Sequence, residues 1–143
     1  MIVLDTQVVS QLQHSSEADI ERLERKLTSL GDQDLRITII TPYEQLSACL
    51  GQIKLNRQRP EDDLANIRRL DDLIAYYASW RGRILLFDEG AVAHFRGFEA
   101  KLIQKIGARD SRIAAIVLSH GGLLLTANLR DFEQVPGLKV QGW

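Results

Sequence analysis

The sequence predicts an α/β protein with three layers, an α/β/α sandwich in which helices cover both faces of a mostly parallel central sheet. Short apolar runs rich in β-branched residues alternate with longer segments whose apolar residues recur at helical spacing. Parallel strands need crossover connections, and a helix is the usual crossover. The chain has 143 residues, 45% of them hydrophobic, which suffices for one core. We therefore expect residues 1–143 to form a single domain.

The first half of the chain reads as strand, helix, strand, helix. Ile2–Leu4 is a short apolar run, typical of a strand buried on both faces, and it stops at Asp5. After a polar stretch, a Ser/Asp capping box and apolar residues at helical spacing predict a helix over 16–31. A second β-branched run covers 37–40, and a helix with proline at its first position follows over 41–53.

The second half continues this alternation. The predicted elements are a helix over 60–80, a strand over 83–87, a helix over 88–107, a helix from residue 110 to the glycines at 121–122, a strand over 123–126 and an edge strand over 138–140. No fixed-period repeat or linker composition interrupts the pattern. The order of elements thus supports a sheet with helices on both faces.

Composition excludes several classes of protein. The chain has 18 basic and 19 acidic residues, net charge -1, so binding to nucleic acid would have to be local. The single cysteine, Cys49, excludes an internal disulfide and any site of several cysteines, and it favours a reducing cytoplasm. The apolar runs are too short to span a bilayer, and no secretion signal is recognisable after Met1. We expect a cytoplasmic protein.

Several polar residues follow predicted strands directly. Ligands of open parallel sheets bind outside the carboxyl ends of the strands, so these positions are the candidate site. They are Asp5, Glu44, Thr126 and Asn128, joined by Asp110 if its helix begins at the same edge. Clustered carboxylates repel one another unless a cation neutralises them, and oxygen ligands favour Mg²⁺ or Mn²⁺. Such a site suits phosphodiester chemistry.

Each acid also has a purely structural interpretation. Glu44 ends a T-x-x-E capping box that starts at Thr41, and Asp110 could simply cap its helix. Asp5 is harder to explain in this way, because we predict no helix immediately after it. From local pattern alone these alternatives stay open for Glu44 and Asp110.

The same residues carry a family resemblance. The motifs are I-V-L-D-T at residues 2–6, T-x-x-E at 41–44, L-F-D at 86–88, I-G-x-x-D-x-x-I-A-A at 106–115, L-L-T-x-N-x-x-D-F at 124–132 and V-P-G-L at 135–138. In this order and spacing they resemble the PIN-domain ribonucleases, and within these the VapC-type toxins of bacterial toxin–antitoxin pairs. The resemblance implies a PIN-like nuclease domain that cleaves RNA with Mg²⁺ or Mn²⁺, with Asp5, Glu44 and Asp110 as catalytic residues and metal ligands. It also implies a cognate antitoxin and a homodimer.

The chain departs from the family pattern at two places. Many relatives have Asn or Cys where this chain has Gln7, whose longer amide could reposition substrate. A fourth acidic position of some relatives falls at Asn128, a neutral residue that we still count with the catalytic set. Asp131 could supply the missing charge, although its Asp-Phe setting also reads as an ordinary turn.

Other residues have ordinary roles as their first interpretation. His14, His94 and His120 match no metal or nucleophile spacing, and we expect them at the surface or at helix ends. Cys49 lies on the apolar face of its helix. The arginines are the candidates for phosphate contacts: Arg109, Arg112 and Arg130 beside the acids, and Arg57 and Arg59 in a basic segment.

The aromatic residues allow two interpretations. Tyr76, Tyr77, Trp80, Phe95 and Phe98 lie on two long predicted helices. They could form a dimer surface that places two acidic sites along a shared groove, or they could complete the core of one chain.

Two functions compete. The first is a metal-dependent endoribonuclease acting as a toxin, and the alternative is a PIN-fold module that binds RNA or a partner with weak or no catalysis. Nucleotide-binding glycine loops are missing from the sequence. An aspartyl phosphatase would typically need an acid where Gln7 stands.

Overall fold

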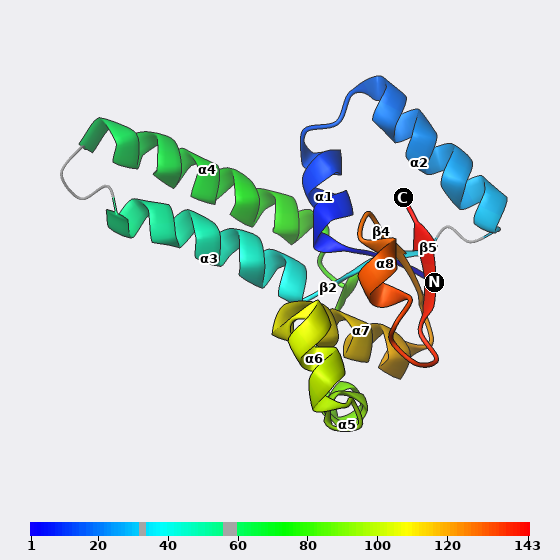
Figure 1. Cartoon of the computed structure of the whole chain (residues 1–143). Helices are drawn as coiled ribbons and strands as arrows, with labels where there is room; N and C mark the ends of the chain where they lie inside the picture. Colours follow the sequence, from blue (N-terminus) through cyan, green and yellow to red (C-terminus); the bar gives the residue numbers. More distant parts are fainter. Residues whose placement is uncertain (32–33, 56–59) are drawn as a thin grey trace.

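The protein is built around a five-stranded sheet in which every strand pair is parallel (Figure 1). The computed structural model describes residues 1–31, 34–55 and 60–143. The strands are β1 (Ile2–Leu4), β2 (Leu35–Thr38), β3 (Ile84–Leu85), β4 (Leu123–Thr126) and β5 (Lys139–Gly142), and their order across the sheet is β3-β2-β1-β4-β5. The predicted parallel sheet is therefore confirmed.

Helices cover both faces of this sheet. They are α1 (Thr6–Gln13), α2 (Glu17–Leu30), α3 (Ile40–Leu55), α4 (Pro60–Ser79), α5 (Glu89–Arg96), α6 (Ala100–Ile106), α7 (Ala108–His120) and α8 (Leu129–Phe132). The hairpin of α3 and α4 projects away from the sheet, while α5, α6 and α7 lie together on another side (Figure 1). No helix among the described residues is long and apolar enough to cross a membrane.

The side chains of β1 divide the core in two. Val3 packs with buried residues of α5, α6 and α7, such as Ala91 and Ile113. Its neighbours Ile2 and Leu4 point to the other face, where they join residues of α1 and α4. Alternation of side chains along a strand requires this division, so an all-apolar strand implies helices on both sides. The three-layer arrangement follows.

Several predicted boundaries were wrong. A helix, α1, begins directly after Asp5, where we predicted none. The second strand ends at Thr38, because the chain already turns into α3 at Ile40. The third strand has two residues instead of five, since Leu86 has left the sheet and is 60% exposed.

The helix predicted over 88–107 is two helices. The first, α5, is capped by Asp88, whose carboxylate accepts a hydrogen bond from the Ala91 amide at 2.9 Å. It ends at Arg96, and after Gly97 and Phe98 the chain starts α6 with Glu99 as its N-cap. The helical spacing of apolar residues continues across this break, so the pattern alone suggested one helix.

Most of the aromatic residues complete the core of a single chain. Tyr77 and Trp80 are 7% and 8% exposed, and the Tyr76 ring lies edge-on to Tyr77 with centroids 5.2 Å apart. Phe95 and Phe98 are half-buried. The exposed large apolar residues of α3 and α4 are different ones: Tyr43, Leu50, Leu64, Ile67 and Ile74. The predicted aromatic dimer surface is therefore wrong for Tyr77 and Trp80.

Candidate active site

A cleft of about 400 Å³ opens at the carboxyl edge of the sheet. It brings together Asp5 at the end of β1, Glu44 on α3, Asp110 on α7 and Asn128 after β4. These four residues are far apart in the sequence; the sheet order places β1 beside β4, and α3 packs against α7. The structure thus gathers the predicted catalytic residues in one place.

Asp5 is the most firmly held of the acids. It is 4% exposed, and its Oδ1 accepts a hydrogen bond from the Thr6 amide at 2.6 Å. Its Oδ2 accepts a second bond from the Thr126 hydroxyl at 2.6 Å, across from β4. Burial raises the pKa of Asp5, and these two hydrogen bonds oppose the rise by stabilising the charged form. Asp5 is also the N-cap of α1, so the expectation that it has no helix to cap was wrong.

Glu44 faces the cleft instead of the start of its own helix. Its Oε2 accepts a hydrogen bond from the Thr6 hydroxyl at 2.6 Å, and Thr6 also lies 3.1 Å from the Thr41 hydroxyl. The other oxygen, Oε1, is 3.5 Å from Arg109 Nη1. Because α3 begins at Ile40, the Thr41 residue is already inside the helix. The contacts favour the site interpretation of Glu44 over the capping interpretation.

Asp110 stands in the first turn of α7, whose N-cap is Gly107. The interpretation of Asp110 as an N-cap was therefore wrong. Burial, followed by repulsion from Asp5, Glu44 and Asp131, raises the pKa of Asp110 to about 6, and a hydrogen bond with the Asn128 side chain opposes the rise. A carboxyl group that resists ionisation beside other carboxylates is typical of a functional site.

Asn128 connects the cleft to Asp131. The Asn128 side-chain amide donates to Asp131 Oδ2 at 2.8 Å, and its backbone amide donates to the Thr126 hydroxyl at 2.9 Å. Asn128 lines the cleft, whereas Asp131 is outside the residues that line it. Asp131 belongs to α8, a short helix at a position where an ordinary turn was the alternative interpretation. This geometry makes Asp131 a residue that orients Asn128 and adds negative charge.

Basic residues border the acids. Arg109 lines the cleft as predicted, and Arg69 of α4 lines it too, although nothing in the sequence around Arg69 signalled this. His14 is exposed at the C-cap of α1, as expected, yet it also lines the cleft. Arg112 lines a neighbouring cleft.

The other residues singled out in the sequence lie at different distances from the cleft or have structural roles. Arg130 is exposed and lies beside Asn128 in the chain, outside the residues that line either cleft. Arg57 and Arg59 lie outside the described residues. Gln7, which departs from the family pattern, is exposed at the cleft wall. Cys49 is buried and donates to the Asn66 carbonyl at 3.4 Å, which confirms its structural role.

The donor atoms of the cleft fit a hard divalent cation. Asp5, Glu44, Asp110 and Asn128 offer only oxygen acceptors of the kind that Mg²⁺ and Mn²⁺ prefer. Within the described residues, no three His, Cys, Asp or Glu side chains are already close enough to hold an ion. The mutual repulsion that raises the pKa of Asp110 is the unfavourable interaction that a cation would relieve.

Comparison with known proteins gives related sequences. Residues 2–138 match the PIN domain family model. The ribonuclease VapC2 of Haemophilus influenzae is 30% identical over 100 residues, which cover 68% of this chain and 72% of that protein. The tRNA(fMet)-specific endonuclease VapC of Salmonella typhimurium is 35% identical over 66 residues, 44% of this chain and 50% of the relative, so that match spans half of the relative's length.

Solved structures show the same fold. The crystal structure of VapBC2 from Rickettsia felis bound to a promoter DNA fragment has a chain with a TM-score of 0.66 and 21% identity, covering 100% of this chain and 99% of that one. The DNA-bound VapBC from Salmonella typhimurium gives a TM-score of 0.66 at 24% identity, covering 99% and 97%. From the family match, the VapC relatives and the shared fold, we conclude that the chain belongs to the PIN domain family, as a VapC-type member.

Proposed function

We propose that the protein is a metal-dependent endoribonuclease and the toxin of a type II toxin–antitoxin pair. The observation that carries this proposal is the convergence of Asp5, Glu44 and Asp110 in one cleft beside Arg109. The related VapC proteins, a ribonuclease and a tRNA(fMet)-specific endonuclease, support it. The reaction is hydrolysis of an RNA phosphodiester bond.

Asp5, Glu44 and Asp110 would hold the cation. Mg²⁺ or Mn²⁺, when bound, would screen the phosphodiester charge and lower the pKa of an attacking water. The hydrogen bonds from Thr6 and Thr126 keep both Asp5 oxygens oriented, so this carboxylate needs no reorganisation. The Thr6 hydroxyl similarly positions Glu44. Asn128 then adds a neutral oxygen and, through Asp131, a fixed orientation.

Arginines at the cleft would bind the RNA backbone. The Arg109 side chain is 66% exposed, so its guanidinium can contact Glu44 and still bind a phosphate. Arg69 enters from α4 on another side of the cleft. Arg130 would add a weaker contact from the surface. Because phosphate contacts carry no sequence information, these residues set the position of the strand and leave its sequence open.

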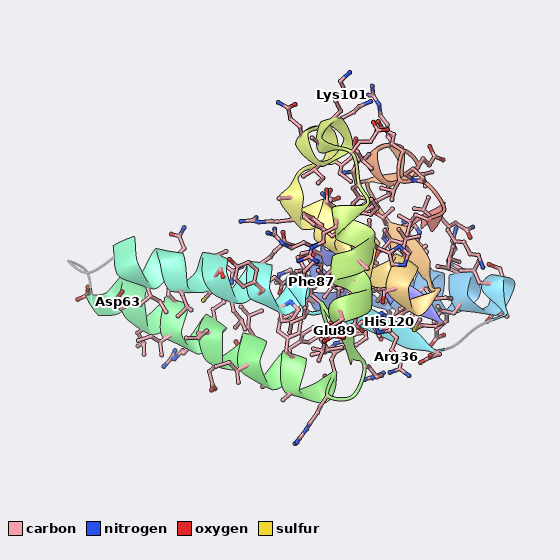
Figure 2. The ribbon with its side chains drawn as sticks, turned by 90° about the horizontal axis from the view of Figure 1, so that it is seen from below. Arg36, Asp63, Phe87, Glu89, Lys101 and His120 are labelled. Carbon is pink, nitrogen blue, oxygen red and sulfur yellow. The ribbon has the colours of Figure 1, made fainter. Side chains whose placement is uncertain are left out.

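The test is cleavage of RNA by purified protein with Mg²⁺ or Mn²⁺, comparing Asp5→Asn, Glu44→Gln and Asp110→Asn with the original chain. Each change should reduce the rate by more than the roughly 10- to 100-fold that is typical when a residue supporting a metal ligand is lost. Glu89→Gln is a matched control, because Glu89 is an exposed acid in the first turn of α5, outside the cleft (Figure 2). Full activity of Glu44→Gln would return Glu44 to a structural role.

The alternative is a module that binds RNA or a partner with weak or no catalysis. The neutral Asn128 favours it, because this residue leaves the site one charge poorer than a fourth acid would. RNA binding without cleavage at any concentration of either ion would support this alternative against the nuclease.

We also propose a cognate antitoxin as partner. Solved structures that share this fold contain VapBC pairs, including VapBC-1 from nontypeable Haemophilus influenzae. An Arg or Lys of the antitoxin's C-terminal segment could occupy the cleft, since a cation there offsets the clustered acids. Unchanged ribonuclease activity in a stable complex with the product of the neighbouring gene would contradict this.

A homodimer, a cytoplasmic location and a single domain over residues 1–143 complete the proposal. The exposed Leu64, Ile67 and Ile74 recur at helical spacing on α4 and are a better candidate dimer surface than the buried aromatics. A monomer mass by light scattering at micromolar concentration would exclude the dimer. The single domain is supported by the sheet, which contains strands from both ends of the chain.

A further inference from the structure

A second cleft of about 440 Å³ adjoins the acid cleft. Its lining residues are Ile39, Ile40, Tyr43, Phe87, Arg109 and Arg112. Arg109 lines both clefts, and its guanidinium is 3.5 Å from Glu44. The two clefts therefore share a wall at Arg109, and we call the second one the aromatic cleft.

The aromatic cleft presents ring surface. Tyr43 is 60% exposed although it directly precedes the site residue Glu44, so its ring is open to a ligand. The Phe87 ring is half-buried and meets Phe95 edge-on, with centroids 6.0 Å apart. Figure 2 labels Phe87 beside α5 and near the beginning of α3, whose first residue, Ile40, lines the same cleft. Packing against Phe95 fixes the Phe87 ring, while the Tyr43 ring remains accessible to a ligand.

The charge of the aromatic cleft is positive. Arg109 and Arg112 line it, and no acid is among the described residues of its wall. The Arg112 guanidinium lies 5.6 Å from the centroid of the Phe95 ring and donates to the Ala108 carbonyl at 3.2 Å. Both contacts orient this cation beside Phe87. The cleft therefore combines flat apolar surface with two phosphate-binding groups.

We propose that the aromatic cleft is a nucleobase subsite for the RNA strand, in which one base stacks on Tyr43 and packs against Phe87 while an adjacent phosphate binds Arg109 and Arg112. This inference rests on the proposed ribonuclease function and adds Tyr43 as a residue that positions the RNA strand. Base stacking on aromatic side chains tolerates every base, because each base has a π face. A cleft of this volume is within the usual range for small-ligand sites, roughly 300–1,000 Å³.

The shared Arg109, and the position of Tyr43 directly before Glu44 in the chain, favour RNA as the occupant. A phosphate at the acid cluster would lie beside Arg109, and the next nucleotide along the strand would meet Tyr43, one residue from Glu44. The two arginines match the charge of a polyanion. A second copy of this chain would bury Tyr43 without engaging the acid cluster beside Arg109, and it is one outcome of the test.

The test is binding of short fluorescent RNA oligonucleotides to the full chain in EDTA, where cleavage does not interfere. Tyr43→Ala should weaken binding by roughly 5- to 10-fold, toward the lower end of measured stacking effects because the ring is exposed. Tyr43→Phe should bind like the original chain. Leu50→Ala is a matched control, because Leu50 is an exposed apolar residue of the same helix outside the cleft.

Oligonucleotides with one abasic residue locate the base. Removal of the base at one position should weaken binding as much as Tyr43→Ala does, and the two changes together should cost no more than either alone. Arg112→Gln should make the negative slope of log affinity against log salt shallower by about 0.7, as expected for one lost phosphate contact on a single strand. Tyr43→Ala and the exposed-surface control Arg81→Gln should leave that slope unchanged.

The outcomes separate this inference from the function on which it rests. If the original chain binds RNA but Tyr43→Ala binds equally well, or if no abasic position couples to Tyr43, the subsite is refuted and the ribonuclease proposal stands. If Tyr43→Ala instead converts a dimer to a monomer, the aromatic cleft is an interface between copies and the inference is wrong. If the original chain binds no RNA in EDTA, the subsite is refuted, and the ribonuclease proposal fails only if the chain also cleaves no RNA with Mg²⁺ or Mn²⁺.

Discussion

Asp110→Asn should stabilise the metal-free protein at neutral pH. The substitution keeps the shape of the side chain and removes one of several mutually repelling carboxylates. The pKa of Asp110 is raised to about 6 from a usual 3.8, and at ~1.4 kcal/mol per pH unit this corresponds to ~3 kcal/mol of destabilisation when the group is ionised. Asp110 is only half-buried, so solvent screening reduces the effect to ~1–2 kcal/mol.

The effect depends on pH in a definite direction. Below pH 3.8 the carboxyl is protonated in the folded and unfolded states, and it costs nothing. Between about pH 4 and 6 the unfolded chain binds fewer protons than the folded one, so the free energy of unfolding falls as pH rises. In the Asp110→Asn variant, the free energy of unfolding does not fall in this way. The increase in its free energy of unfolding over that of the original chain should therefore be near zero at pH 4 and fully present at pH 7.5.

Urea unfolding in EDTA at both pH values measures this difference. Glu89→Gln is the matched control, because Glu89 also stands in the first turn of a helix but is exposed and outside the cleft. Glu89→Gln should lower the free energy of unfolding by ~0.3–1 kcal/mol, because the charge that interacts with the helix dipole is removed. A destabilised Asp110→Asn at pH 7.5, or an equal gain at pH 4, would show that burial and repulsion do not disfavour the charged form of Asp110 as we argue.

Three further changes test the site and its support. Thr126→Val removes the hydroxyl that donates to the buried Asp5 Oδ2 and should cost ~1–3 kcal/mol in urea unfolding, whereas Thr126→Ser should cost much less. Binding of Mn²⁺ by calorimetry should strengthen as pH rises through about 6, because Asp110 must lose its proton to act as a ligand, and equal affinity at pH 5 and 7.5 would contradict this. Phe132→Ala empties a fully buried position beneath α8 and should cost ~3–5 kcal/mol, so a loss below 1 kcal/mol would mean that this part of the core is loosely packed.

The sequence predicted the fold class from its buried strands, and it predicted the residues that line the cleft from the acid after β1 and from the family motifs. Ile2–Leu4 is short, apolar and followed by an acid, and its burial on two faces requires helices on both sides. The position of Asp5 at the sheet edge follows directly. The helix α1 was not predicted, because its polar and β-branched residues gave too short an apolar pattern around Val8 and Val9.

Residues that reach the site from remote elements could not be predicted in the same way. Arg69 comes from α4, and its position depends on how the hairpin of α3 and α4 packs against α1, which no local pattern specifies. Thr6 looked like part of a motif, but its contact with Glu44 appears only when α1 and α3 are placed together. Tyr43 was read within a capping box, and its exposure became visible only in the structure.

The sheet order explains why the acids meet at this place. From β1 the chain passes to β2 and β3 on one side and then returns to β4 and β5 on the other. The order reverses between β1 and β4, and at such a switch point the connecting segments diverge and leave a crevice at the carboxyl edge. Asp5 ends β1 and Thr126 ends β4, and their hydrogen bond crosses this point. The helices α3 and α7 then contribute Glu44 and Asp110, so the fold produces a charged cleft where these elements meet.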